Sequence, residues 1–107
     1  MKTIETTSNA DVTLKQLGGQ GRLRAMINAR NFFSNHGGRT LQFDFSGWRK
    51  ANRCEIELLE GDDVYTVRFF RIPRNSTLCT LVAEFECVYC DELVARFESE
   101  TGLRLAL

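Results

Sequence analysis

The chain has 107 residues, of which 43% are hydrophobic and 26% are charged, and its formal net charge is zero. A chain of this length and composition suits one compact domain and leaves no room for a second one. No run in it approaches the ~20 apolar residues of a transmembrane helix, and the first ten residues lack the apolar stretch of a secretory signal. We therefore expect a cytoplasmic protein without a membrane partner.

The zero net charge conceals a division of charge along the chain. Residues 12–53 carry eight basic groups against one acidic group, Asp44, whereas residues 54–107 carry five basic groups against eleven acidic ones. This division predicts one basic and one acidic surface, unless the fold interleaves the two halves.

The beginning of the chain predicts a flexible segment and then a short helix. Residues 1–10 are polar and are expected to be flexible, followed by a single α+β domain over residues 11–107. In DVTLKQLGG, Asp11 offers an N-cap and the two glycines stop the helix. The next segment fits both a helix and a strand. We expect extended structure over residues 22–27, because the preceding glycines would leave a helix there without a cap.

The middle of the chain predicts antiparallel strands. Apolar and polar residues alternate in TLQFDFS, RCEIELL, VYTVRFFRI and LCTLVAEFEC, and short turns such as EGDD and PRNST connect the last three. In the first hairpin Cys54 is expected to face Phe69. In the second, centred on Asn75, Phe69 is expected to face Leu81. Both registers place the apolar side chains on one face, which is typical of a meander of four to five strands.

The end of the chain predicts a helix that covers this apolar face. In YCDELVARFESETGL, an apolar stripe is formed by Tyr89, Leu93, Val94 and Phe97, and Gly102 is expected to stop the helix. The expected architecture is an α+β domain. It consists of an antiparallel β-meander, a C-terminal helix packed on one face and a short N-terminal helix.

Two of the four cysteines, Cys87 and Cys90, have the C-x-x-C spacing of half a zinc site. On one continuous strand Cys79 would lie roughly 26 Å from Cys87, which excludes a site made of all four thiols. The predicted register makes Cys87 the last inward residue of its strand and places it opposite Asp63. The candidate metal ligands are therefore Cys87, Cys90, His36 and Asp63. Zinc is possible there but not required, because only one ligand pair is present.

The alternative is that the cysteines are unreactive thiols of the core, since free cysteine is among the most buried residue types. The alternation of their neighbours places Cys54 and Cys79 inward. Nucleophilic catalysis has little support, because the single histidine, His36, has no identifiable carboxylate and thiol partners. We do not expect an enzyme.

The basic half of the chain predicts a surface for a partner or for nucleic acid. Its cations supply the charge, and three aromatic residues among them, Phe32, Phe33 and Trp48, supply stacking faces. The alternative is that these aromatic residues belong to the core and the arginines to a solvated face. The candidate binding residues are Arg22, Arg24, Arg30, Arg39, Arg49, Lys50 and Arg53.

Three segments of the chain, TLKQLGG, MINARNFF and VYCDELVARFESETGL, resemble motifs of a family of small phage and prophage proteins without a settled function. Cys90 departs from the family's small apolar residue, so any role for it is peculiar to this protein. The resemblance implies a phage-encoded protein in the bacterial cytoplasm that binds and blocks a host macromolecule. An anti-CRISPR inhibitor of a CRISPR effector nuclease is the leading expectation. The alternative is a nucleic-acid-binding accessory module that uses the basic region 22–53.

Overall fold

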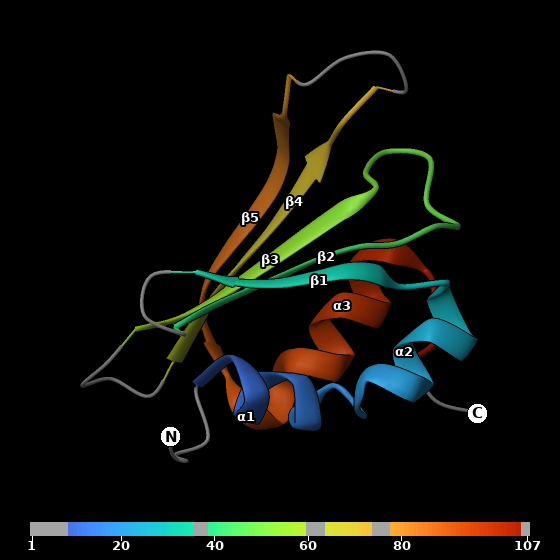
Figure 1. Ribbon diagram of the computed structural model, residues 1–107. Coiled ribbons are helices and arrows are strands. Elements are labelled where there is room, and N and C mark those ends of the chain that lie inside the picture. Colours follow the sequence, from blue (N-terminus) through green and yellow to red (C-terminus); the bar gives the residue numbers. More distant parts are fainter. Residues whose placement is uncertain (1–8, 36–38, 60–63, 74–77, 106–107) are drawn as a thin grey trace.

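The computed structural model describes residues 9–35, 39–59, 64–73 and 78–105. Within them, five strands form one antiparallel sheet in chain order, so each strand pairs with the next (Figure 1). The strands are β1 (Arg30–Asn35), β2 (Thr40–Asp44), β3 (Arg53–Leu59), β4 (Val64–Arg71) and β5 (Thr80–Tyr89). The expected antiparallel meander is confirmed.

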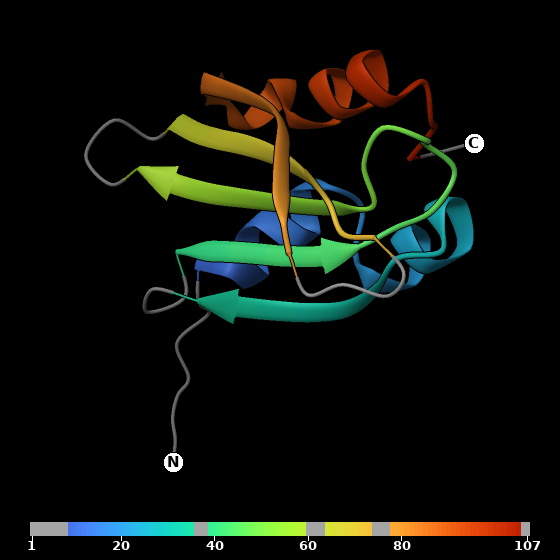
Figure 2. The same ribbon diagram turned by 90° about the horizontal axis from the view of Figure 1, so that it is seen from above.

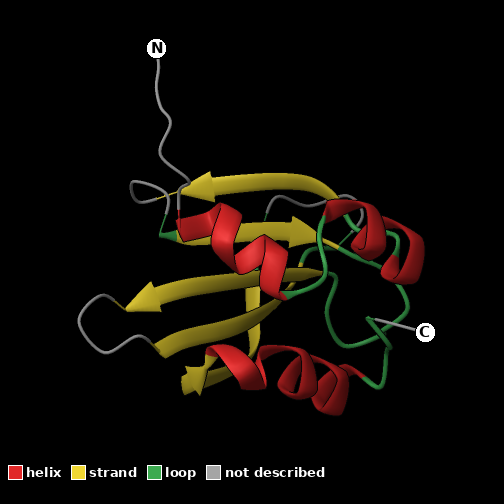
Figure 3. Ribbon diagram, turned by 90° about the horizontal axis from the view of Figure 1, so that it is seen from below, coloured by secondary structure: helices red, strands yellow, loops and turns green. Residues whose placement is uncertain are grey.

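The described helices all lie on one face of the sheet (Figure 3), and no helix of the described residues covers the opposite face (Figure 2). They are α1 (Asn9–Gln16), α2 (Gln20–Ile27), the short 3₁₀ helix η2 (Cys90–Glu92) and α3 (Leu93–Thr101). The N-terminal and C-terminal helices expected from the sequence are thereby confirmed, and the domain is α+β. Among the described residues, no helix is long and apolar enough to cross a bilayer.

The expectation of extended structure over 22–27 is wrong, because α2 occupies these residues. As expected, its N-cap, Gly19, has no side-chain hydrogen bond. A missing cap costs about 0.5–2 kcal/mol, whereas burying an apolar side chain contributes about 1.5–3 kcal/mol. The helix buries both Leu23 and Ile27, which are 0% and 3% exposed. The tertiary contacts therefore outweigh the missing cap.

The core between helices and sheet is built on phenylalanine rings. The ring of Phe97, on α3, lies 5.4 Å from that of Phe45 and 5.6 Å from that of Phe69. Leu93, one turn earlier, is also buried, and Gly102 ends the helix in the left-handed region at φ 76°. Tyr89 is the exception to the predicted stripe, since it is 56% exposed.

The two hairpins differ in how well the sequence predicted their register. Cys54 faces Phe69 as expected. In the second hairpin the expected pairing is wrong, because Phe69 faces Ala83 and Leu81 faces Phe70. The cause is a bulge, in which β5 has one extra residue between these two pairs. A second irregularity follows further along β5. A slip of one residue turns side chains to the other face, and Leu81 is accordingly 50% exposed.

Candidate functional site

The loop between β2 and β3, residues 45–52, is held by three backbone hydrogen bonds, two of which join it to other elements. The N–H of Ser46 donates to the carbonyl of Ile27, 3.0 Å away, at the end of α2. The N–H of Asn52 donates to the carbonyl of Phe70 on β4, also at 3.0 Å. A third bond, of 2.9 Å, closes the loop from the N–H of Phe45 to the carbonyl of Asn52. The loop therefore presents its side chains from a fixed backbone.

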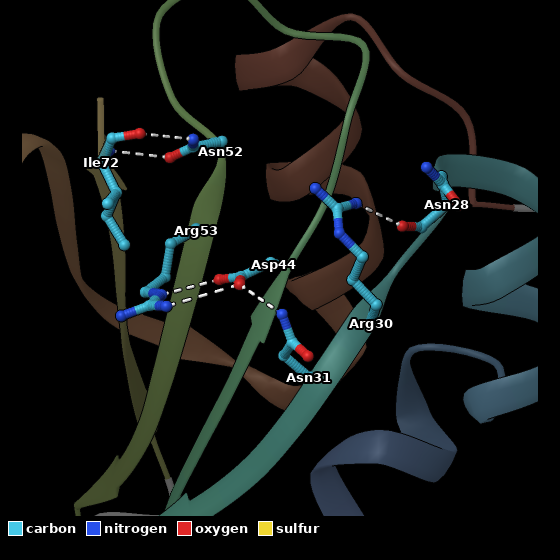
Figure 4. Close-up of polar contacts among 7 residues, drawn as sticks. All are labelled: Asn28, Arg30, Asn31, Asp44, Asn52, Arg53 and Ile72. Carbon is cyan, nitrogen blue, oxygen red and sulfur yellow. Dashed lines mark hydrogen bonds and ion pairs between the residues drawn. The ribbon is translucent and has the colours of Figure 1, made fainter. Parts of the chain in front are cut away.

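The side chain of Asn52 strengthens this attachment. Its amide Nδ2 donates to the carbonyl of Ile72, and its Oδ1 accepts from the N–H of the same residue, both at 2.9 Å (Figure 4). This reciprocal pair copies the hydrogen bonding of two paired strands. It joins the end of the loop to the residues that follow β4.

A hollow lies beside the loop and is lined by Gly47, Trp48, Arg49 and Arg71. We call it the tryptophan hollow. The half-buried ring of Trp48 meets the ring of Phe69 edge to face, at 5.2 Å and 82°. Arg71 approaches from β4 and donates from Nη1 to the carbonyl of Arg49, 3.1 Å away. The hollow thus combines one aromatic ring with two exposed guanidinium groups.

The start of β1 adds a further cation to this end of the sheet. Arg30 donates from Nη1 to the carbonyl of Asn28 at 2.9 Å (Figure 4). The same nitrogen donates to the hydroxyl Oγ of Ser46 at 3.2 Å. The bond to Ser46 ties this arginine to the loop. We define the basic loop surface as the side chains of Arg30, Trp48, Arg49, Lys50 and Arg71. Among the described residues, none of its four cations forms an ion pair.

Arg53, a predicted binding residue, is neutralised by an ion pair. Its Nε donates to Oδ1 of Asp44 at 2.7 Å, while Nδ2 of Asn31 donates to Oδ2 of the same carboxylate at 2.9 Å (Figure 4). Burial acts to raise the pKa of Asp44. The hydrogen bonds from Arg53 and Asn31 and the nearby positive charges outweigh it, so this pKa lies below its ordinary value.

The open face of the sheet carries a second set of ion pairs, centred on Arg68. Its guanidinium lies 3.1 Å from Glu55, 3.0 Å from Glu57 and 2.7 Å from Glu84. The acidic half of the chain therefore neutralises one of its own arginines on this face. The loop end of the sheet, by contrast, keeps cations without ionic partners among the described residues.

The structure brings together only part of the predicted binding set. Arg49 and Lys50 lie in the loop between β2 and β3, and Arg30 is hydrogen-bonded to Ser46 of the same loop. Arg22 and Arg24 lie on α2, where Arg24 covers the ring of Phe32 at 5.9 Å. Arg39 lies just before β2, at the opposite end of that strand from the loop.

Arg71 belongs to the basic loop surface, although it is not among the predicted binding residues. The sequence signal that could have identified it is its position at the end of the predicted strand VYTVRFFRI. In a meander this strand lies beside the strand that follows the loop. Of the predicted aromatic residues, Phe32 packs against the core, whereas Phe33 is 54% exposed on β1.

The proposed metal ligands are only partly described. His36 and Asp63 lie outside the described residues, and Cys87 and Cys90 are both exposed. The inward position expected for Cys87 is wrong, because this residue lies at the second irregularity of β5 and has φ 58°. The described part of the chain contains no group of three or more His, Cys, Asp or Glu residues that could hold a metal. Zinc stays a prediction that depends on the two residues outside this part.

The other two thiols differ from each other. Cys54 is fully buried, as expected, and burial raises the pKa of its thiol. Cys79, also expected to point inward, is exposed. The bulge in β5 explains this correction, since it reverses which face the side chains before it occupy.

Comparison with known proteins adds no relative, because no protein-family model, curated protein or solved structure matches the chain. The basic loop surface and its tryptophan hollow are thus the features from which a function can be inferred.

Proposed function

We propose that the protein acts by stoichiometric binding, and that it blocks a host macromolecule through the basic loop surface. The supporting observation is the charge that this surface leaves uncompensated. Arg53 and Arg68 are neutralised by carboxylates, whereas Arg49 on the loop and Arg71 on β4 flank an open hollow. An uncompensated cluster of cations on a rigid backbone favours and steers an anionic partner.

The target class that we propose is a CRISPR effector nuclease. The motifs resembling those of phage and prophage proteins support a role against host defence in the bacterial cytoplasm. Effector complexes of this kind carry a guide RNA and bind DNA, so they present the polyanion that a basic surface recognises. Binding of this protein to the nucleic acid of the effector complex would exclude the substrate DNA without any chemical step.

A titration of effector cleavage tests this proposal. Inhibition should reach its limit near one protein per effector complex. The double variant Arg49→Glu, Arg71→Glu should lose inhibition, because it reverses charge on both sides of the hollow. Arg96→Glu is the matched control, since this exposed arginine lies on α3 and lines a separate hollow. No inhibition, together with no stoichiometric partner pulled from a host lysate, would rule the proposal out.

A nucleic-acid-binding accessory module is the second candidate function. The observation in its favour is the aromatic ring of Trp48 between two arginines, a combination that nucleic-acid grooves use. This candidate predicts that the purified protein shifts nucleic acid in a mobility-shift assay but does not inhibit effector cleavage at one protein per effector complex. The cleavage titration therefore separates the two candidates.

A further inference from the structure

The tryptophan hollow joins a stacking surface to positive charge. The ring of Trp48 is positioned by its edge-to-face contact with Phe69, which itself is fully buried in the core. Trp48 is only half-buried, and it lines the open hollow. A ring that is fixed on one side and open on another can receive a planar group without a change in the fold. Bases stack on aromatic side chains in this way, whatever their sequence.

The two arginines of the hollow keep donors for a ligand. Arg71 uses Nη1 to bind the carbonyl of Arg49, and a guanidinium has five N–H donors in all. That contact also holds the guanidinium of Arg71 against the loop that carries Trp48. Arg49 is exposed and has no ion pair among the described residues. Guanidinium groups bind phosphate oxygens in bidentate geometry, so both side chains suit a phosphate backbone.

We infer that the tryptophan hollow binds single-stranded nucleic acid, with a base stacked on Trp48 and the adjacent phosphates held by Arg49 and Arg71. A single strand is favoured over a duplex because paired bases are stacked on one another and cannot cover a side-chain ring. Arg30 and Lys50 extend the positive charge beyond the hollow. The inference rests on the proposed function, since it names the chemical group that the same surface contacts.

The fluorescence of Trp48 reports on this site directly, because it is the single tryptophan of the chain. Titration with an oligothymidylate of about ten nucleotides, a length within the usual range of single-strand sites, should quench the emission. Heparin, a polyanion without bases, should bind in competition but leave the emission nearly unchanged. The same oligonucleotide annealed to its complement should quench far less than the single strand.

Variants separate stacking from charge when binding is followed by the anisotropy of a labelled oligothymidylate. Trp48→Ala should weaken binding by about five- to 150-fold, as expected for the loss of one stacked base. Trp48→Phe keeps a ring against Phe69 and should retain most of the affinity, which guards against a mere loss of folding. Arg96→Ala should bind like the wild type, because this arginine lies outside the basic loop surface.

Three results would overturn the inference. The first is equal affinity of wild type and Trp48→Ala. The second is binding of oligothymidylate and heparin with no quenching by either. The third is no binding of the oligonucleotide at low salt. If effector inhibition still depended on Arg49 and Arg71, the proposed function would stand without this inference, so the two can fail separately.

Discussion

Replacing Gly47 with alanine should destabilise the protein through the basic loop. This glycine has φ 108°, a conformation that costs a residue with a side chain about 1–3 kcal/mol. A Cβ atom there would also lie 2.9 Å from Cδ2 of Leu103, which must then move. For a domain of this size, 1–3 kcal/mol corresponds to a fall in Tm of roughly 5–20 °C. Differential scanning calorimetry measures it.

Gly21→Ala is the matched control, since it adds the same methyl group elsewhere. Gly21 lies in α2, and a Cβ atom there meets nothing within 4 Å. Alanine is favoured over glycine in a helix by up to about 1 kcal/mol, so the Tm should stay the same or rise. If Gly47→Ala had no larger effect than Gly21→Ala, the described geometry of the loop would be refuted.

The aromatic core, one ion pair and the cysteines each make a further prediction. Phe97→Ala removes the central ring of the core and should cost about 3–5 kcal/mol in urea unfolding, and a loss below about 1 kcal/mol would contradict this packing. Asp44 has a lowered pKa in the folded protein. Its contribution to the stability of the fold is therefore complete above the ordinary pKa of 3.8 and is lost as the pH falls through the lower pKa of the folded state. Asp44→Asn should therefore flatten the acid limb of stability against pH, and an unchanged limb would speak against the ion pair. A thiol reagent should modify the three exposed cysteines of the native protein but reach Cys54 only after denaturation, whereas four fast thiols would show that Cys54 is accessible.

The fold was largely predictable because alternation fixes the face of each strand. Cys54 and Phe69 face each other as their apolar pattern predicts. The second hairpin was less predictable, since a bulge changes the register without leaving a clear signal in the residue pattern. Leu81 and Cys79 are therefore exposed, although alternation counted back from Phe85 places both inward.

The sequence predicted which types of residue form the candidate site, but not which individual residues belong to it. The sequence identifies the cations of the basic half, and it cannot show which of them a carboxylate neutralises. Arg53 does not belong to the basic loop surface, because the pairing of β2 with β3 places Asp44 beside it. Arg71 does belong to this surface, because the sheet order brings the end of β4 next to the loop. Both outcomes depend on contacts between strands, which local pattern does not encode.

The salt dependence of nucleic-acid binding tests most directly whether the basic loop surface is the binding surface. Three to four phosphate contacts on a single strand predict that affinity falls roughly 20- to 50-fold between 50 and 200 mM salt. The double variant Arg49→Ala, Arg71→Ala should bind more weakly and reduce the slope of log affinity against log salt by about 1.4. Equal slopes and affinities for the two proteins, measured by the anisotropy of a labelled oligothymidylate, would contradict the account.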